Sequence, residues 1–117
     1  MLFERAEDLG RLIGQTNEAK ALRRAEEGLR ADDVARGHLE KMQTIARQMD
    51  ALMAQGQMPE ETATQEYETS VRAFELSPTG QAYIVARQNF EKVMAKVNEE
   101  MAKGIEKGAT SNIITLG

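Results

Sequence analysis

The stretch SPTGQAYIVARQNFEKVMAKVNEEMAKGIEK, residues 77–107, decides the fold. Its apolar residues follow one another at steps of three or four: Tyr83, Ala86, Phe90, Val93, Val97, Met101 and Ile105. This spacing keeps side chains on one face of a helix, and charged residues occupy the other faces. Ser77 suits the N-cap, Pro78 suits the first helical position, and Gly104 or Gly108 can supply the C-cap. The stretch therefore predicts one long amphipathic helix whose apolar stripe must be covered by other helices.

A second long apolar stripe lies between residues 32 and 56. Asp32 can cap the start of a helix here, and Gly56 can end it. The stripe follows helical spacing through Ala35, His38, Met42, Ile45, Met49 and Leu52. Two long helices in one chain predict a long antiparallel helical hairpin, residues 32–56 against residues 78–107.

Shorter amphipathic segments complete the chain. Helical spacing is present over residues 3–14, 17–30 and 60–76, and Thr16-Asn17 offers a cap for the second of these segments. The fold class is therefore all-α, with about five helices and the shorter ones packed on the hairpin. We expect a single domain over residues 1–108, followed by a flexible apolar C-terminal tail at 109–117.

The composition limits the function classes. The net charge is −4, with 15 Lys and Arg against 19 Asp and Glu. A general nucleic-acid binder needs a surplus of basic side chains to neutralise phosphates, so direct nucleic-acid binding is disfavoured. The alternative function, a small helical nucleic-acid-binding module, would use the basic face of residues 20–36, formed by Lys20, Arg23, Arg24, Arg30 and Arg36.

The side chains that usually carry catalysis or bind metals are scarce. The chain has one histidine and no cysteine, which excludes zinc sites of the His/Cys type within one protomer. No phosphate-binding loop or nucleophile elbow is present. We expect no cofactor, no metal site and no enzymatic activity. His38 is expected to be a packed or interface-rim side chain, with a pH-sensitive or ligand-binding role as the alternative.

The location follows from what the sequence lacks. No run approaches the ~20 apolar residues that a membrane-spanning helix needs. The first ten residues, MLFERAEDLG, contain charges within the first few positions and no apolar core of signal-peptide length. We expect a soluble cytoplasmic protein without a membrane partner.

Two long stripes indicate self-association. The shorter helices are not expected to cover both stripes, so a homodimer or higher homo-oligomer would complete the bundle. The expected oligomer or partner interface comprises Met42, Ile45, Met49, Leu52, Tyr83, Phe90, Val93, Val97 and Met101. Within the tail, Ile113, Ile114 and Leu116 form a possible partner-docking segment.

A series of short motifs stands in a characteristic order along the chain up to about residue 107. In order they are Ala6-Glu7-Asp8-Leu9-Gly10 with Ile13, Thr16, Ala25-Glu26, Leu29, Asp32, Gly56, Tyr67, Ser77-Pro78 and Tyr83 with Ala86. In this order and spacing the chain resembles the YlbF/YmcA family of bacterial cell-fate regulators. The resemblance implies an oligomeric helical protein with a non-catalytic role. It also implies paralogues or the ribonuclease machinery as partners, since some members modulate ribonuclease Y-dependent RNA processing and thereby competence, sporulation and biofilm formation. Members that bind iron–sulfur clusters use cysteines, so this chain is more similar to the YheA-like members.

Overall fold

The computed structural model describes the backbone of residues 1–116 and the side chains of residues 1–110. It contains five α-helices: α1 (Leu2–Gly14), α2 (Asn17–Ala31), α3 (Asp33–Ala54), α4 (Glu61–Leu76) and α5 (Pro78–Leu116). No strand is present in the described backbone, so the predicted all-α class with five helices is confirmed.

Three of the helices begin at predicted caps. The Thr16 hydroxyl accepts from the backbone N–H of Ala19 at 3.1 Å, and the Asp32 carboxylate accepts from that of Ala35 at 3.1 Å. At the start of α5, the Ser77 hydroxyl accepts from the N–H of Gly80 at 3.0 Å and donates to the Phe74 carbonyl at 2.8 Å. The three bonds from N–H groups satisfy backbone donors that a helix leaves free in its first turn, and the bond to Phe74 satisfies a free carbonyl in the last turn of α4.

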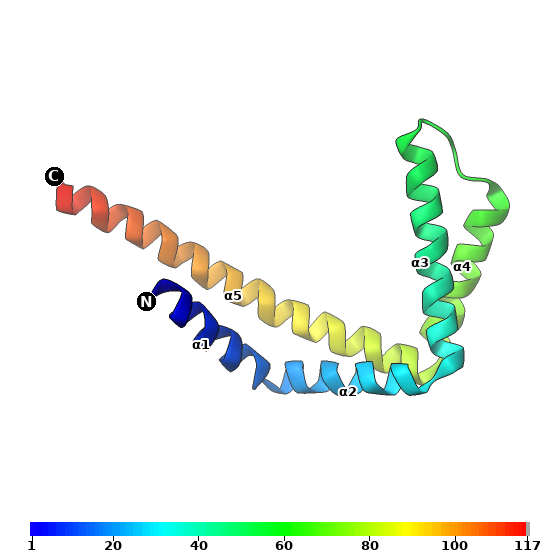
Figure 1. The fold of residues 1–117 in the computed structure, drawn as a ribbon, viewed down its shortest axis with the longest axis horizontal. Helices are drawn as coiled ribbons and strands as arrows, with labels where there is room; N and C mark the ends of the chain where they lie inside the picture. The colour runs from blue at the N-terminus through cyan, green and yellow to red at the C-terminus, as the bar shows by residue number, and fades with distance from the viewer. Residues whose placement is uncertain (117) are drawn as a thin grey trace.

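The helices form two arms that meet at an elbow (Figure 1). In the long arm, α2 packs along α5, and α1 continues in the same direction. In the short arm, α3 and α4 pack side by side as an antiparallel pair. The predicted hairpin of 32–56 against 78–107 is therefore wrong, because each of these helices pairs with a different partner.

The connections explain this pairing. One residue, Asp32, separates α2 from α3, and one residue, Ser77, separates α4 from α5. Both residues are extended, with ψ of 93° and 140°, so the chain turns sharply at each of them. The loop between α3 and α4 contains Gly56, whose φ of 76° lies in the left-handed region, and it folds α4 back along α3.

The elbow contains the main core. Leu29, Ala35 and Phe74 come from α2, α3 and α4, and all three are buried. Leu39, Met42, Tyr83 and Ile84 pack against them. Phe74 is only 2% exposed, and its ring meets that of Tyr83 edge to face, with centroids 6.2 Å apart. This contact holds the short arm against the first turns of α5.

The last helix extends beyond its expected end. We predicted a C-cap at Gly104 or Gly108, but α5 continues to Leu116 and Gly56 is the only glycine with positive φ in the described chain. The side chains of the predicted docking segment, Ile113, Ile114 and Leu116, lie outside the described residues. The tail therefore stays a prediction.

The molecule is far from compact. Its radius of gyration is 20.4 Å, against about 13 Å for a compact domain of this length. Its accessible surface is 9013 Å², whereas a compact monomer of 13.0 kDa exposes about 6,300 Å². One protomer thus leaves about 2,700 Å² more surface in water than its mass requires.

Candidate functional site

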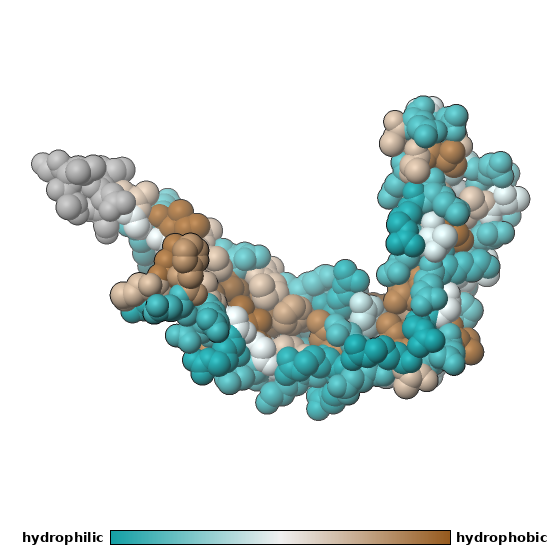
Figure 2. Space-filling model, in the orientation of Figure 1, coloured by the Kyte–Doolittle hydropathy of each residue, from teal (hydrophilic) through white to brown (hydrophobic). Residues whose placement is uncertain are grey.

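The far half of the long arm carries uncovered apolar side chains. Figure 2 shows them as brown patches over α1 and the distal part of α5. Ile105 on α5 is 73% exposed, and Phe3 on α1 is 83% exposed. Leu2, Leu12 and Met101 are also exposed. A contiguous apolar surface of this kind is typical of a protein–protein contact site.

A gap lies between α1 and α5 within this surface. It has a volume of about 410 Å³ and is lined by Leu9, Val97 and Met101, with Lys96 and Glu100 at its edge. Lys96 and Glu100 pair with each other at 3.2 Å. The apolar stripe of α5 is therefore only partly covered by α1.

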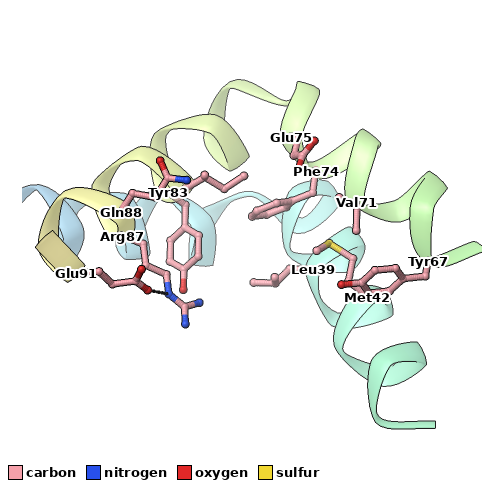
Figure 3. A pocket seen from close by; sticks show the side chains of 11 residues that line it. Leu39, Met42, Tyr67, Val71, Phe74, Glu75, Tyr83, Arg87, Gln88 and Glu91 are labelled. Atoms are coloured by element: carbon pink, nitrogen blue, oxygen red, sulfur yellow. Dashed lines mark hydrogen bonds and ion pairs between the residues drawn. The ribbon is translucent and has the colours of Figure 1, made fainter. Parts of the chain in front are cut away.

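A second cavity lies inside the elbow, where α3, α4 and α5 meet. It has a volume of about 380 Å³. Figure 3 shows its side chains: Leu39 and Met42 come from α3, Tyr67, Val71 and Phe74 from α4, and Tyr83 and Arg87 from α5. Glu75, Gln88 and Glu91 stand at its polar edge. We call this cavity the elbow groove.

One cation in the groove is already paired. Arg87 Nε donates to Glu91 Oε1 at 3.2 Å, one helical turn further along α5 (Figure 3). The neighbouring Tyr83 phenol, and then Glu91, raise the pKa of the Arg87 guanidinium. Arg87 thus remains a fixed positive group whose charge is largely balanced within α5.

The predicted interface residues are divided between the two arms. Met42, Ile45, Met49 and Leu52 lie on the face of α3 that packs toward α4, where Ile45 is buried within the protomer. Phe90, Val93 and Val97 are half-buried along α5, and Met101 is more open. Tyr83 lies in the elbow groove. The structure thus brings only the members on distal α5 together with the uncovered surface of α1.

The predicted basic face is partly used for helix ends. Arg23 donates to the Gly14 carbonyl at 2.9 Å and so satisfies the end of α1. Arg36 donates to the Arg30 carbonyl at 2.6 Å, at the end of α2, and pairs with Asp33 at 2.7 Å. Two of the five basic side chains therefore have structural partners, which counts against a nucleic-acid surface there.

The described residues contain neither a cluster of metal-binding side chains nor a membrane-spanning helix. His38 is half-buried on α3. Within the part of the chain that the structure describes, no three His, Cys, Asp or Glu side chains gather as a metal site would require. Over the same residues, no helix has the length and apolar character needed to cross a bilayer.

Two features of the elbow were missed in the sequence. A Cβ at Gly80 would stand against the Phe74 carbonyl oxygen and 2.7 Å from Ser77 Oγ, so only glycine fits this close turn. The pattern Ser-Pro-x-Gly at 77–80 could have indicated it. The acidic side of the groove was also missed, although Glu61, Glu68 and Glu75 repeat at steps of seven.

Comparisons with known proteins agree on one family. A family profile described as "Control of competence regulator ComK, YlbF/YmcA" matches residues 2–106. A UPF0342 protein from Desulfitobacterium hafniense is 29% identical over 104 residues, which cover 89% of this chain and 79% of that protein. No solved structure matches the chain.

Proposed function

The chain belongs to the YlbF/YmcA family, and on that premise we propose that it is a non-catalytic regulatory adaptor that acts through contacts with other protein chains. The family profile is linked to control of a competence regulator, which fits a regulatory role. The structure adds a physical reason for contact-based action, because so much apolar surface stays open in one protomer.

The observation that carries the proposal is the excess accessible surface. One protomer exposes 9013 Å², about 2,700 Å² above the expectation for its mass. A standard protein interface buries about 800 Å² on each partner, so the excess is enough for more than one interface. Self-association through the long arm and binding of a different partner are therefore compatible.

We place the self-association on α1 and distal α5. Phe90, Val93, Val97 and Met101 would pack against the same helices of a second copy, together with Leu9 from α1. Such an arrangement makes a four-helix contact with a continuous apolar seam. The α3 members of the predicted interface, Met42 to Leu52, would instead stabilise the short arm, because α4 lies against that face.

The regulated process that we propose is RNA processing of the ribonuclease Y type, and through it competence, sporulation and biofilm formation. The chain would contact paralogues or the ribonuclease machinery rather than RNA. The three glutamates interleaved with the four basic side chains of α2, and the structural use of Arg23 and Arg36, support protein contact over RNA contact. This role places the chain in the cytoplasm.

Self-association is tested by a matched pair of variants. Val97→Asp puts a charge into the seam, whereas Asn98→Asp adds the same charge at the exposed next position. By light scattering at about 10 μM, where a stable dimer of nanomolar to micromolar Kd is largely assembled, we expect a dimer or larger species for the wild type and Asn98→Asp. Val97→Asp should be monomeric, because an unpaired buried charge costs several kcal/mol. A monomeric wild type would contradict the proposed seam.

The regulatory role is tested in the native cell. The tagged wild-type chain should co-purify with a paralogue or a ribonuclease component, and its deletion should change the lengths of the transcripts processed by that enzyme. If neither the co-purification nor the transcripts respond, the ribonuclease link is wrong.

A further inference from the structure

The negative charge of the chain is concentrated on one helix. From the N-cap Glu60 to the end of α4 there are five glutamates and one arginine, so this segment alone carries a charge equal to the chain's net −4. The remaining segments balance to zero. A helix with this asymmetry sets up a local negative potential that the rest of the surface lacks.

The acidic side chains are ordered along the helix. Glu61, Glu68 and Glu75 stand two turns apart in sequence, so they share one side of α4. All three are exposed. Among the salt bridges of residues 1–110, none involves a side chain of α4, although carboxylates on α1, α3 and α5 have basic partners. Arg72, the one basic side chain of α4, lies one turn from both Glu68 and Glu75 and lines the same shallow cavity, so the stripe presents a reduced but still negative charge to solvent.

The acidic stripe borders the elbow groove. Tyr67, Val71 and Phe74 line the groove from the same helix, and Glu75 stands at its edge. Glu68 lies beside Tyr67 and Val71 in the shallow cavity next to it. From α3, Met42 adds a flexible thioether to the groove floor (Figure 3). An apolar floor with a methionine, next to an anionic edge, suits an amphipathic helix whose polar face is basic.

We propose that the elbow groove and the stripe Glu61/Glu68/Glu75 together form a docking site for a basic amphipathic helix of a partner protein. This inference rests on the proposed adaptor function and adds the chemistry of the partner. Apolar side chains of the incoming helix would contact the half-buried Tyr67, Val71 and Tyr83. Its lysines or arginines would face the three glutamates, while Arg87 stays paired with Glu91.

The dimensions match such a partner. Glu61 to Glu75 spans 14 residues, or about 21 Å of helix at 1.5 Å per residue. An incoming helix of about four turns covers this length. The negative edge repels nucleic acid and anionic lipid headgroups, which carry the same sign of charge. Charge complementarity therefore favours a basic polypeptide over these other occupants.

The test uses two synthetic peptides of about 18 residues, one an amphipathic Leu/Lys helix and the other its Leu/Glu counterpart. Binding to the full chain is measured by calorimetry at low and high salt. The groove variant carries Glu61→Gln, Glu68→Gln and Glu75→Gln together. The matched control carries Glu7→Gln, Glu27→Gln and Glu106→Gln, three exposed positions on the long arm with the same change in net charge.

We expect the Leu/Lys peptide to bind the wild type and the control, with affinities within about twofold of each other. The groove variant should bind about tenfold more weakly, since three rim charges of about 0.5 kcal/mol each account for one decade. Higher salt should weaken binding to the wild type. Amide shifts in NMR spectra should map to Val71, Phe74, Tyr83 and Arg87.

Four results would overturn the inference: no binding of the Leu/Lys peptide, equal binding of the Leu/Glu peptide, equal losses in the groove and control variants, or shifts that map to distal α5. A change of oligomeric mass in the groove variant would identify a second copy as the occupant and would also overturn it. A failure of the proposed function can be told apart from a failure of the docking site. If the wild type does not bind the Leu/Lys peptide but still co-purifies with the ribonuclease, only the docking site is wrong. If the wild type binds the peptide but does not co-purify with the ribonuclease, the docking site stands and the ribonuclease link is wrong.

Discussion

The elbow buries its apolar side chains within one protomer, whereas the distal half of the long arm leaves many of them exposed. At the elbow, the side chains of Asp32 and Ser77 bond to backbone groups at the helix ends, and Phe74 is sealed by side chains from α2, α3 and α5. On distal α5 the same kind of amphipathic helix has Met101 and Ile105 open to water. The comparison teaches that one protomer buries the core of the elbow by itself and leaves the apolar side chains of the distal arm open to water.

The difference has a local origin. The elbow concentrates two single-residue links, so four helix ends meet there and bury one another. The distal arm has only α1 to cover α5, and α1 is short and contains no buried residue. Variants in the two regions should therefore differ in kind as well as in size.

The largest expected effect is at the elbow core. Phe74→Ala removes the most buried large side chain and should lower the free energy of unfolding by about 3–5 kcal/mol. Leu76→Ala, two residues further on and 71% exposed, should change it by less than about 0.5 kcal/mol. Urea unfolding followed by circular dichroism measures both. Similar losses in the two variants would remove the distinction between a sealed elbow and an open surface.

The second prediction concerns the distal arm and the dependence of stability on protein concentration. If the distal arm is completed by a second copy, raising the protein concentration a hundredfold should stabilise the wild type by about 2.7 kcal/mol. The Val97→Asp variant should lose this concentration dependence, while Phe74→Ala should keep it. The measurement is the thermal midpoint across that concentration range. A concentration-independent midpoint in the wild type would contradict an open arm that another copy covers.

The third prediction compares substitutions at two glycines of α5. Gly80→Ala forces a Cβ against the Phe74 carbonyl and Ser77 Oγ, so the turn between α4 and α5 must open, at a cost of about 2 kcal/mol. Gly104 has nothing within 4 Å of an added Cβ, and it lies inside a helix. Gly104→Ala should therefore stabilise the chain by about 0.5–1 kcal/mol. Denaturant midpoints of the two variants should move in opposite directions, and a shared direction would show that the turn is not as tight as described.

The smallest effect is the pH dependence at Asp32. The backbone N–H of Ala35, and then the Thr79 hydroxyl, hold the pKa of this carboxyl below its usual range. A lowered pKa in the folded state means that the stabilisation is complete above the unfolded value of about 3.9 and is lost as the pH falls through the folded value. Asp32→Asn can still cap α3 but cannot titrate. Between about pH 5 and pH 2, where carboxyl groups titrate, the unfolding midpoint of this variant should fall less than that of the wild type. Equal falls in the two midpoints would show that other groups cause the acid sensitivity.

The sequence predicted the helices and their starts well, because Thr16, Asp32 and Ser77 each act within one turn of chain. It did not predict which helices pair. An apolar stripe says which face is buried, and it does not say which neighbour buries it. The single-residue links at Asp32 and Ser77 contain that information, since they force α2 and α3, and α4 and α5, to diverge.

The candidate sites were predicted unevenly for the same reason. The stripe of distal α5 was identified from spacing, and the structure leaves part of it uncovered. The stripe of α3 has the same pattern but faces α4. The elbow groove joins residues from three helices, so no single segment indicates it. Each glutamate of α4 taken alone resembles an ordinary solvated position, and only the assembled fold places the acidic side beside the groove.

The length of α5 has a mechanical consequence. From Pro78 to Thr110 the helix is unbroken, a distance of about 48 Å. A rod of this length amplifies tilt: one degree of rotation about Ser77 displaces Thr110 by about 0.8 Å. Tyr83, in the second turn of α5, lies against Phe74, so a small tilt of α5 relative to the short arm corresponds to a much larger displacement of its far end. The proposed groove contacts this helix at Tyr83 and Arg87, and the proposed seam contacts it further along, at Val97 and Met101.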